Sequence, residues 1–132
     1  IVGFPGESDE DFQQTFDFIH NLDISYLHVF SFSDRDNTDA LKINSKLPPN
    51  VIAKRSQILH HLSNQKRHRF FQQNLGQVRQ VLTESWEEGI LTGLTDNYIP
   101  VKLSGTAQEV NQIIPLSLTE INNGQVQGDR LD

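Results

Sequence analysis

The sequence contains no cysteine, which excludes disulfide bonds and thiolate metal ligands within its 132 residues. Long hydrophobic runs are also absent, since no apolar stretch approaches the roughly 20 residues that a membrane-spanning helix needs. The mean hydropathy is −0.47 and 36% of the residues are hydrophobic, as in an ordinary globular protein. We therefore expect no contact with a membrane, and either one domain or two small ones.

Acidic and basic residues are separated along the chain, although the net charge is only −6. Residues 1–49 carry nine acids and three bases, residues 50–75 five bases and no acid, and residues 76–132 eight acids and three bases. A basic segment of this kind can contact nucleic acid. It can equally neutralise acidic segments that pack against it, and the sequence alone leaves both interpretations open.

The first twelve residues, IVGFPGESDEDF, indicate the end of a buried strand that turns into a helix. Gly3 and Gly6 supply backbone freedom on either side of the turn. Ser8 is a favourable N-cap, and acids follow in the first helical turn. A strand that stops at a glycine turn and feeds a helix is the repeating unit of parallel α/β sheets and barrels. Because the chain begins inside this strand, we expect further units upstream of it.

Helical periodicity ends near Asn21, and the pattern then predicts a strand over residues 25–33 and a polar loop over residues 33–45. Bulky side chains occupy both faces of this strand, as expected where helices cover the outside of a barrel. His28 lies within it without a second ligand at matching spacing. We interpret His28 as a structural histidine.

A long helix is predicted over residues 51–74, directly after a pair of prolines. Three bases, Arg55, Lys66 and Arg69, would fall on or beside the apolar stripe of a straight helix. Either the helix bends near residues 63–64, or these bases reach carboxylates of the acidic first segment. The second arrangement would leave little of the basic charge free for RNA.

Everything after Gly76 indicates β structure, because short runs of strand-forming residues alternate with turn residues. Five strands in fewer than sixty residues predict a small closed barrel. The predicted strands cover residues 77–85, 90–95, 98–103, 112–121 and 125–130, with a turn at 86–89.

Three motifs in this order resemble the radical S-adenosylmethionine (radical-SAM) tRNA methylthiotransferases. They are IVGFPGE at residues 1–7, LHVFSFSDR at residues 27–35 and GLTDNYIPV at residues 93–101. The first two are similar to late strands of the radical-SAM barrel and the third to the C-terminal TRAM domain of that family. The forms of the second and third motifs are most similar to the threonylcarbamoyladenosine branch.

The resemblance implies a fold of the α/β plus all-β class. Residues 1–47 would form the last βα units of a radical-SAM barrel, which is a partial TIM-type barrel. Residues 48–75 would form a connecting helix. Residues 76–132 would form the TRAM domain, a small five-stranded OB-like β-barrel that grips tRNA in the resembled enzymes.

The implied activity is the addition of a methylthio group to a modified adenosine next to the anticodon, with tRNA as partner in the cytoplasm. Full-length enzymes of this kind use S-adenosylmethionine and two [4Fe-4S] clusters. This segment alone, without cysteine, is expected to hold no cluster and to be inactive. An isolated piece of a barrel also exposes strand edges, which makes self-association an expectation. The alternative is a non-catalytic OB-like module that binds RNA or protein.

Candidate residues of the cofactor site follow from the matched motifs, and no catalytic residue or metal ligand is assigned to this segment. Val2, Gly3, Gly6 and Glu7 are predicted to form one wall of the S-adenosylmethionine site. Arg35 is the candidate in the loop at the active-site end of the barrel, and it could instead brace the loop by pairing with Asp34, Asp36 or Asp39. The family reads SPRxGTxA in this loop, whereas this chain has Asp34 for the proline and Asn37 for the glycine. Asparagine tolerates the left-handed conformation best after glycine.

Candidate RNA contacts lie in the predicted barrel, and they are side chains able to bind phosphate or to stack on a base. They are Arg79, Trp86, Tyr98 and Lys102, with Arg130 as a further base. Because the domain is acidic overall, any such contact would depend on local side chains rather than on bulk charge. Tyr98 could instead be half core and Trp86 could instead close the barrel.

Overall fold

A computed structural model describes residues 1–131 and divides the chain into two compact units, Ile1–Arg67 and His68–Asp132. The helix α2, Pro49–Asn74, runs through the division. Each unit is described by itself.

In the first unit, helix α1, Asp9–Asn21, begins at the predicted N-cap. The Asp11 backbone N–H donates to the Ser8 hydroxyl over 3.0 Å, and the Ser8 N–H donates to the Asp11 carboxylate over 2.9 Å. These reciprocal bonds satisfy two N–H groups that a helix start leaves free. The Ser8 N–H and then the Ser8 hydroxyl, which both donate to the carboxylate, lower the pKa of Asp11. At the other end, Lys66 donates to the carbonyls of His20 and Leu22 over 3.1 and 2.7 Å. A cation there complements the helix dipole.

The predicted strand over residues 25–33 is wrong as a regular strand. Within this range only Ser31 forms a β-bridge, and its parallel partner is Val2. The Val2 N–H donates to the Phe30 carbonyl over 2.9 Å, and the Phe32 N–H donates to the Val2 carbonyl over 2.7 Å. A parallel ladder cannot extend further because Gly3 turns the partner segment away at a φ of +83°. Leu27 instead exchanges hydrogen bonds with the Ser63 hydroxyl of α2. The backbone is therefore satisfied by a helix side chain rather than by a second strand.

Side chains of this extended segment still alternate as predicted. Leu27 and Val29 pack against a core of Val2, Phe12, Leu59 and Leu62, which joins the segment to both helices. The opposite face, with Tyr26, His28 and Phe30, is exposed rather than covered. A short 3-10 helix, η1, Asp39–Lys42, follows in the polar loop.

Helix α2 is one unbroken helix of 26 residues, so the alternative of a bend at residues 63–64 is not needed. Arg55 reaches Glu7 and Asp9 of the acidic first segment, as the other alternative required. Lys66 caps α1, and only Arg69 of the three bases in question is exposed. Two of the five bases of residues 50–75 are thereby used inside the first unit.

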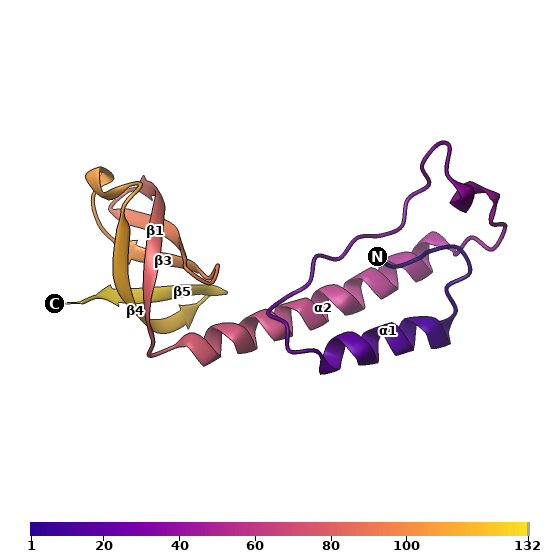
Figure 1. The fold of residues 1–132 in the computed structure, drawn as a ribbon, viewed down its shortest axis with the longest axis horizontal. Helices are drawn as coiled ribbons and strands as arrows, with labels where there is room; N and C mark the ends of the chain where they lie inside the picture. The colour runs from indigo at the N-terminus through magenta and orange to yellow at the C-terminus, as the bar shows by residue number, and fades with distance from the viewer. Residues whose placement is uncertain (132) are drawn as a thin grey trace. The chain divides into compact units, whose positions relative to one another are not determined.

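The second unit contains the predicted closed barrel of five strands (Figure 1). Its strand order, β1-β2-β3-β5-β4, closes through antiparallel pairs and one parallel pair between β3 and β5. This OB-like topology confirms the all-β part of the predicted fold. The other part, a piece of a radical-SAM barrel in residues 1–47, is not shown by the structure. The strands are β1 Val78–Glu87, β2 Ile90–Thr95, β3 Pro100–Ser104, β4 Ile113–Asn122 and β5 Gln125–Arg130, with a 3-10 helix η2 at Ala107–Glu109.

Two boundaries differ from the prediction. β1 continues through Trp86 to Glu87, because the reversal needs only Glu88 and Gly89, both at positive φ as in a tight hairpin. β3 begins at Pro100, because Tyr98 adopts a φ of +64° and belongs to the preceding turn. A tyrosine in the left-handed region costs about 1–2 kcal/mol.

The barrel core is aliphatic, and it is closed at one end by Phe71 from the last turns of α2. The buried members are Phe71, Val81, Leu91, Ile99, Val101, Leu103, Leu116, Leu118 and Val126. Gly93 lets β1 and β2 approach, because a Cβ at this position would lie 2.3 Å from the Leu82 carbonyl oxygen. That oxygen is backbone and cannot move aside.

We expect Gly93→Ala to lower the free energy of unfolding of the barrel by about 1–3 kcal/mol, because the added methyl group forces the paired strands apart. Urea titration followed by the fluorescence of Trp86, the only tryptophan, measures this change. Gln125→Ala at an exposed strand position is the control, with an expected change within about 0.5 kcal/mol. Equal midpoints for the two variants would contradict the steric explanation.

Candidate cofactor and nucleic-acid surfaces

The glycine turn that joins the first residues to α1 is held by its own hydrogen bonds. The Gly3 N–H donates to Glu7 Oε1 over 3.0 Å. The Gly6 N–H donates to the Ser45 carbonyl over 2.7 Å, and the Glu7 N–H donates to the Phe4 carbonyl over 2.9 Å. The Val2 side chain is fully buried and its N–H is bonded as well. The four residues predicted to line a cofactor site therefore present no free backbone N–H to a ligand.

Packing, rather than ligand approach, explains the first glycine. A Cβ on Gly3 would lie 2.6 to 2.9 Å from the side chain of Ile52 in α2. Gly6 is different, because nothing lies within 4 Å of its ideal Cβ position and only its φ of +88° favours glycine. Of the two, only Gly6 leaves room for another molecule.

Glu7 is part of a partly buried charge network that ties the turn to α2. Arg55 forms an ion pair with Glu7, and the exposed fractions of the two side chains are 6% and 12%. The same guanidinium donates to Asp9 over 2.8 Å and to the Glu7 carbonyl over 2.9 Å, and it lies 5.4 Å above the Phe12 ring. The Glu7 carboxylate is thus held by partners within the first unit, the Gly3 N–H and the Arg55 guanidinium.

We expect Arg55→Ala to destabilise the first unit by about 3 kcal/mol, because it leaves the Glu7 carboxylate largely buried without its partner. Lys54→Ala, on the exposed neighbouring residue, should change the free energy of unfolding by less than about 0.5 kcal/mol. Far-UV circular dichroism in urea measures both variants. If Arg55→Ala were as stable as Lys54→Ala, the buried pair would not be what holds this turn.

Arg35 lies at an apolar cavity of about 530 Å³ within the first unit. Two of its three possible loop partners are engaged elsewhere, since Asp34 pairs with Lys46 and Asp39 with Lys42, each at 2.6 Å. Within residues 1–131 the Arg35 guanidinium forms no ion pair, and Asn37 adopts the predicted left-handed conformation at φ +64°. A cation beside an apolar cavity suits a ligand with a flat ring and a negative group. The cavity is lined by Ile1, Phe30, Ser31, Phe32, Ser33, Arg35, Thr38 and Ala40.

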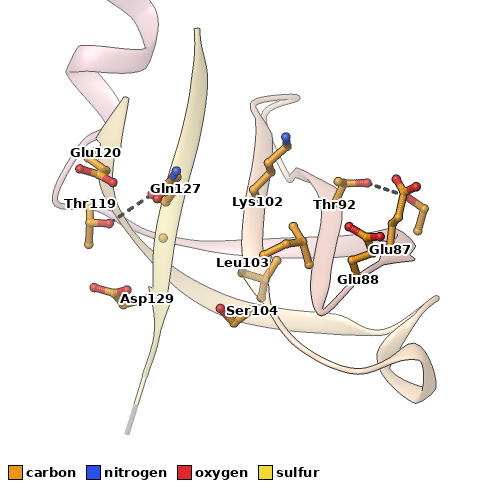
Figure 2. A pocket seen from close by; sticks show the side chains of 13 residues that line it. Glu87, Glu88, Thr92, Lys102, Leu103, Ser104, Thr119, Glu120, Gln127 and Asp129 are labelled. Carbon is orange, nitrogen blue, oxygen red and sulfur yellow. Dashed lines mark hydrogen bonds between the residues drawn. The ribbon is translucent and has the colours of Figure 1, made fainter. Parts of the chain in front are cut away.

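A second cavity, of about 750 Å³, is a groove on the outer surface of the barrel. Lys102 is the only base among the residues that line the groove (Figure 2). Four carboxylates also line it, those of Glu87, Glu88, Glu120 and Asp129. Across its floor, residues paired on neighbouring strands form the polar row Ser85, Thr92, Lys102 and Gln127. The groove is therefore acidic.

The remaining predicted RNA contacts do not meet in this groove. Trp86 uses its indole N–H on the Gly105 carbonyl over 2.9 Å, and its exposed fraction is 42%. Arg79 donates to Asn74 and Gln77 and lies 3.7 Å from Asp96. The arginine is thereby committed to internal partners.

Arg130 is likewise occupied, because it pairs with Glu109 at 2.7 Å and donates to the Ser104 carbonyl. Tyr98 is the most exposed of the predicted contacts, with 74% of its surface accessible. Asn74, which no sequence signal marked, accepts hydrogen bonds from both Arg79 and Asn97. An asparagine at a helix end ordinarily indicates a cap rather than a buried junction.

The Thr106 backbone N–H, the Arg130 guanidinium and the Thr106 hydroxyl, in decreasing order of effect, hold the pKa of Glu109 below its ordinary value of 4.5. Because the pKa of Glu109 falls on folding, these interactions of its carboxylate stabilise the folded state above pH 4.5. The stabilisation is lost as the pH falls through the lowered pKa of the folded state. We expect NMR titration to give a pKa below 4.5, with Arg130→Gln raising it only part of the way. Titration of Glu109 at or above 4.5 in the wild-type protein would contradict the assignment.

Among residues 1–131, no group of three or more histidine, aspartate and glutamate side chains is arranged to hold a metal ion. The same residues include no helix that is both long and apolar enough to cross a membrane. His28 forms an edge-to-face pair with Tyr26 at 5.2 Å between ring centres.

No protein-family profile matches the chain. It is, however, 43% identical over 114 residues to the threonylcarbamoyladenosine tRNA methylthiotransferase MtaB of Aquifex aeolicus, a match that covers 86% of this chain and 27% of that protein. The Bacillus subtilis protein of the same name is 34% identical over 134 residues, covering 95% of this chain and 30% of the relative.

A tRNA-2-methylthio-N(6)-dimethylallyladenosine synthase from Lachnoclostridium phytofermentans is 27% identical over the whole of this chain and 30% of its own length. The chain thus spans less than a third of the length of these relatives. An OB-like barrel follows a helical unit in a chain whose homologues are tRNA methylthiotransferases. This finding confirms the family resemblance of the three sequence motifs.

Proposed function

We propose that this chain is the C-terminal part of a radical-SAM tRNA methylthiotransferase of the threonylcarbamoyladenosine branch. The observation that carries the proposal is the match of 86% of the chain to a threonylcarbamoyladenosine tRNA methylthiotransferase at 43% identity. The intact enzyme would add a methylthio group to a modified adenosine next to the anticodon, in the cytoplasm. The OB-like topology of the second unit supports a TRAM domain as its tRNA-binding part.

In the intact enzyme the first unit would supply the last βα units of the radical-SAM barrel. The parallel bridge between Val2 and Ser31, with α1 between the two segments, has the connectivity of such a unit. Bound S-adenosylmethionine and the two [4Fe-4S] clusters would supply the radical, methyl and sulfur chemistry. Since this chain has no cysteine, the cluster ligands would come from elsewhere in the enzyme.

Val2, Gly3, Gly6 and Glu7 would form the wall of the S-adenosylmethionine site as a preformed turn. The bonded N–H groups and the Arg55 network support a role in shape rather than in hydrogen bonding to the ligand. Arg35 would face the substrate from the apolar cavity, where its unpaired charge is available. In the second unit, Arg79, Trp86, Tyr98 and Lys102 are the candidates for contact with tRNA.

The isolated chain would be inactive, and its exposed apolar residues support self-association outside the intact enzyme. Ile1, Phe4 and Phe30 lie on the exposed surface of the first unit. A non-catalytic OB-like module that binds RNA or protein is the second candidate function, and the closed five-stranded barrel of the second unit supports it.

Deletion of the gene should remove 2-methylthio-N(6)-threonylcarbamoyladenosine from total tRNA and leave the precursor threonylcarbamoyladenosine in its place. Liquid chromatography with mass spectrometry of tRNA nucleosides measures both species. Re-expression of the full-length gene should restore the methylthio nucleoside, whereas expression of residues 1–132 alone should not. An unchanged nucleoside profile in the deletion strain would refute the enzymatic function and favour the binding module.

A further inference from the structure

Tyr98 is displayed on the barrel surface in an unfavourable backbone conformation. Its exposed fraction is 74% and its φ is +64°, a region that asparagine or glycine would occupy at lower cost. A large aromatic side chain gains nothing from burial at this position, since the ring faces solvent. A strained residue that contributes no core packing is a reason to look for a function.

The turn that carries Tyr98 is built as a rigid frame. The Tyr98 N–H donates to the Thr95 carbonyl over 2.9 Å, and the Thr95 hydroxyl bonds to Asn97 over 2.7 Å and accepts from the Ile99 N–H over 2.8 Å. Asn97 in turn donates to the buried Asn74 amide of α2 over 3.0 Å. The backbone of the turn is fixed before any partner arrives, which lowers the entropic cost of binding.

The acidic residue nearest to Tyr98 in the chain has a basic partner. Asp96 is next but one to Tyr98 in the chain and lies 3.7 Å from Arg79, so the carboxylate is compensated by a guanidinium. By contrast, the groove that contains Lys102 has four carboxylates. A phosphate backbone that approached the groove would be repelled by these carboxylates, whereas the one carboxylate in the turn of Tyr98 is paired with a guanidinium.

We infer that the barrel contacts RNA through Tyr98, whose ring stacks on an unpaired base, and that the acidic groove does not contact the RNA backbone. The inference rests on the proposed function, which supplies tRNA as the partner. RNA is favoured over a protein partner because polar residues, Asp96 and Asn97, precede the ring, whereas protein hot spots lie in desolvated apolar surroundings. Unpaired bases of an RNA loop need only an accessible aromatic face.

The test is the binding of unmodified tRNA to the full-length enzyme at fixed salt, measured by fluorescence anisotropy. Tyr98→Ala should weaken binding by about 5-fold to 150-fold, the range expected for loss of one stacked base. Tyr98→Phe keeps the ring and should bind within about twofold of the wild-type protein, since stacking needs no hydroxyl group.

Tyr98→Asn separates function from folding. Asparagine relieves the backbone strain, so this variant should melt at a temperature equal to or above that of the wild-type protein while losing tRNA affinity. Glu120→Gln is the groove control and should leave affinity unchanged. Lys102→Ala should cost less affinity than Tyr98→Ala.

Three results would overturn the inference: wild-type affinity in Tyr98→Asn, a greater loss in Lys102→Ala than in Tyr98→Ala, or tighter binding in Glu120→Gln. Any of them, with the wild-type enzyme still binding tRNA, leaves the proposed function standing. If Tyr98→Asn loses nothing, the exposed ring serves a protein partner or none. If the wild-type enzyme binds no tRNA, the proposed function itself fails together with the inference.

Discussion

The buried amide of Asn74 is the junction on which the second unit depends. Its nitrogen donates to the Phe70 carbonyl over 2.8 Å, and its oxygen accepts from Arg79 over 2.9 Å and from Asn97 over 3.0 Å. One side chain thus links the end of α2, the start of β1 and the turn between β2 and β3. Because a buried amide without partners costs about 1–3 kcal/mol, these three elements are fixed together. Phe71, one turn earlier, fills the barrel core from the same helix.

Local signals in the sequence were sufficient for most of the fold. The Ser8 cap, the long second helix and the barrel strands were predictable because capping, helical periodicity and turn residues act over a few positions. The strand over residues 25–33 was not, because a parallel strand depends on distant partners, and here Ser63 of α2 takes over one of its hydrogen-bonding roles. The sequence predicts a strand at Tyr98 because tyrosine favours strands, and no propensity reveals that hydrogen bonds in the turn hold this residue at positive φ.

The candidate site was less predictable than the fold, since it depends on which charges are already paired. The sequence identified Arg79, Arg130 and the basic helix as sources of positive charge. In the structure Arg55 and Lys66 are used within the first unit, Arg67 lies 5.0 Å over the Tyr26 ring, and Arg130 is bound to Glu109. The interpretation of the basic segment as a neutralising one is therefore favoured. Lys54 and Arg69 of the basic segment stay exposed, so less positive charge is accessible to a nucleic acid than the sequence suggests.

Ultraviolet cross-linking of the full-length enzyme to tRNA, followed by tandem mass spectrometry that assigns the nucleotide to a single residue, tests this account most directly. A stacked aromatic ring cross-links efficiently to the base it touches, so the account predicts a nucleotide on Tyr98 itself and its loss in Tyr98→Asn. Cross-links within the barrel that are confined to the groove residues, such as Lys102 and Glu120, would contradict it.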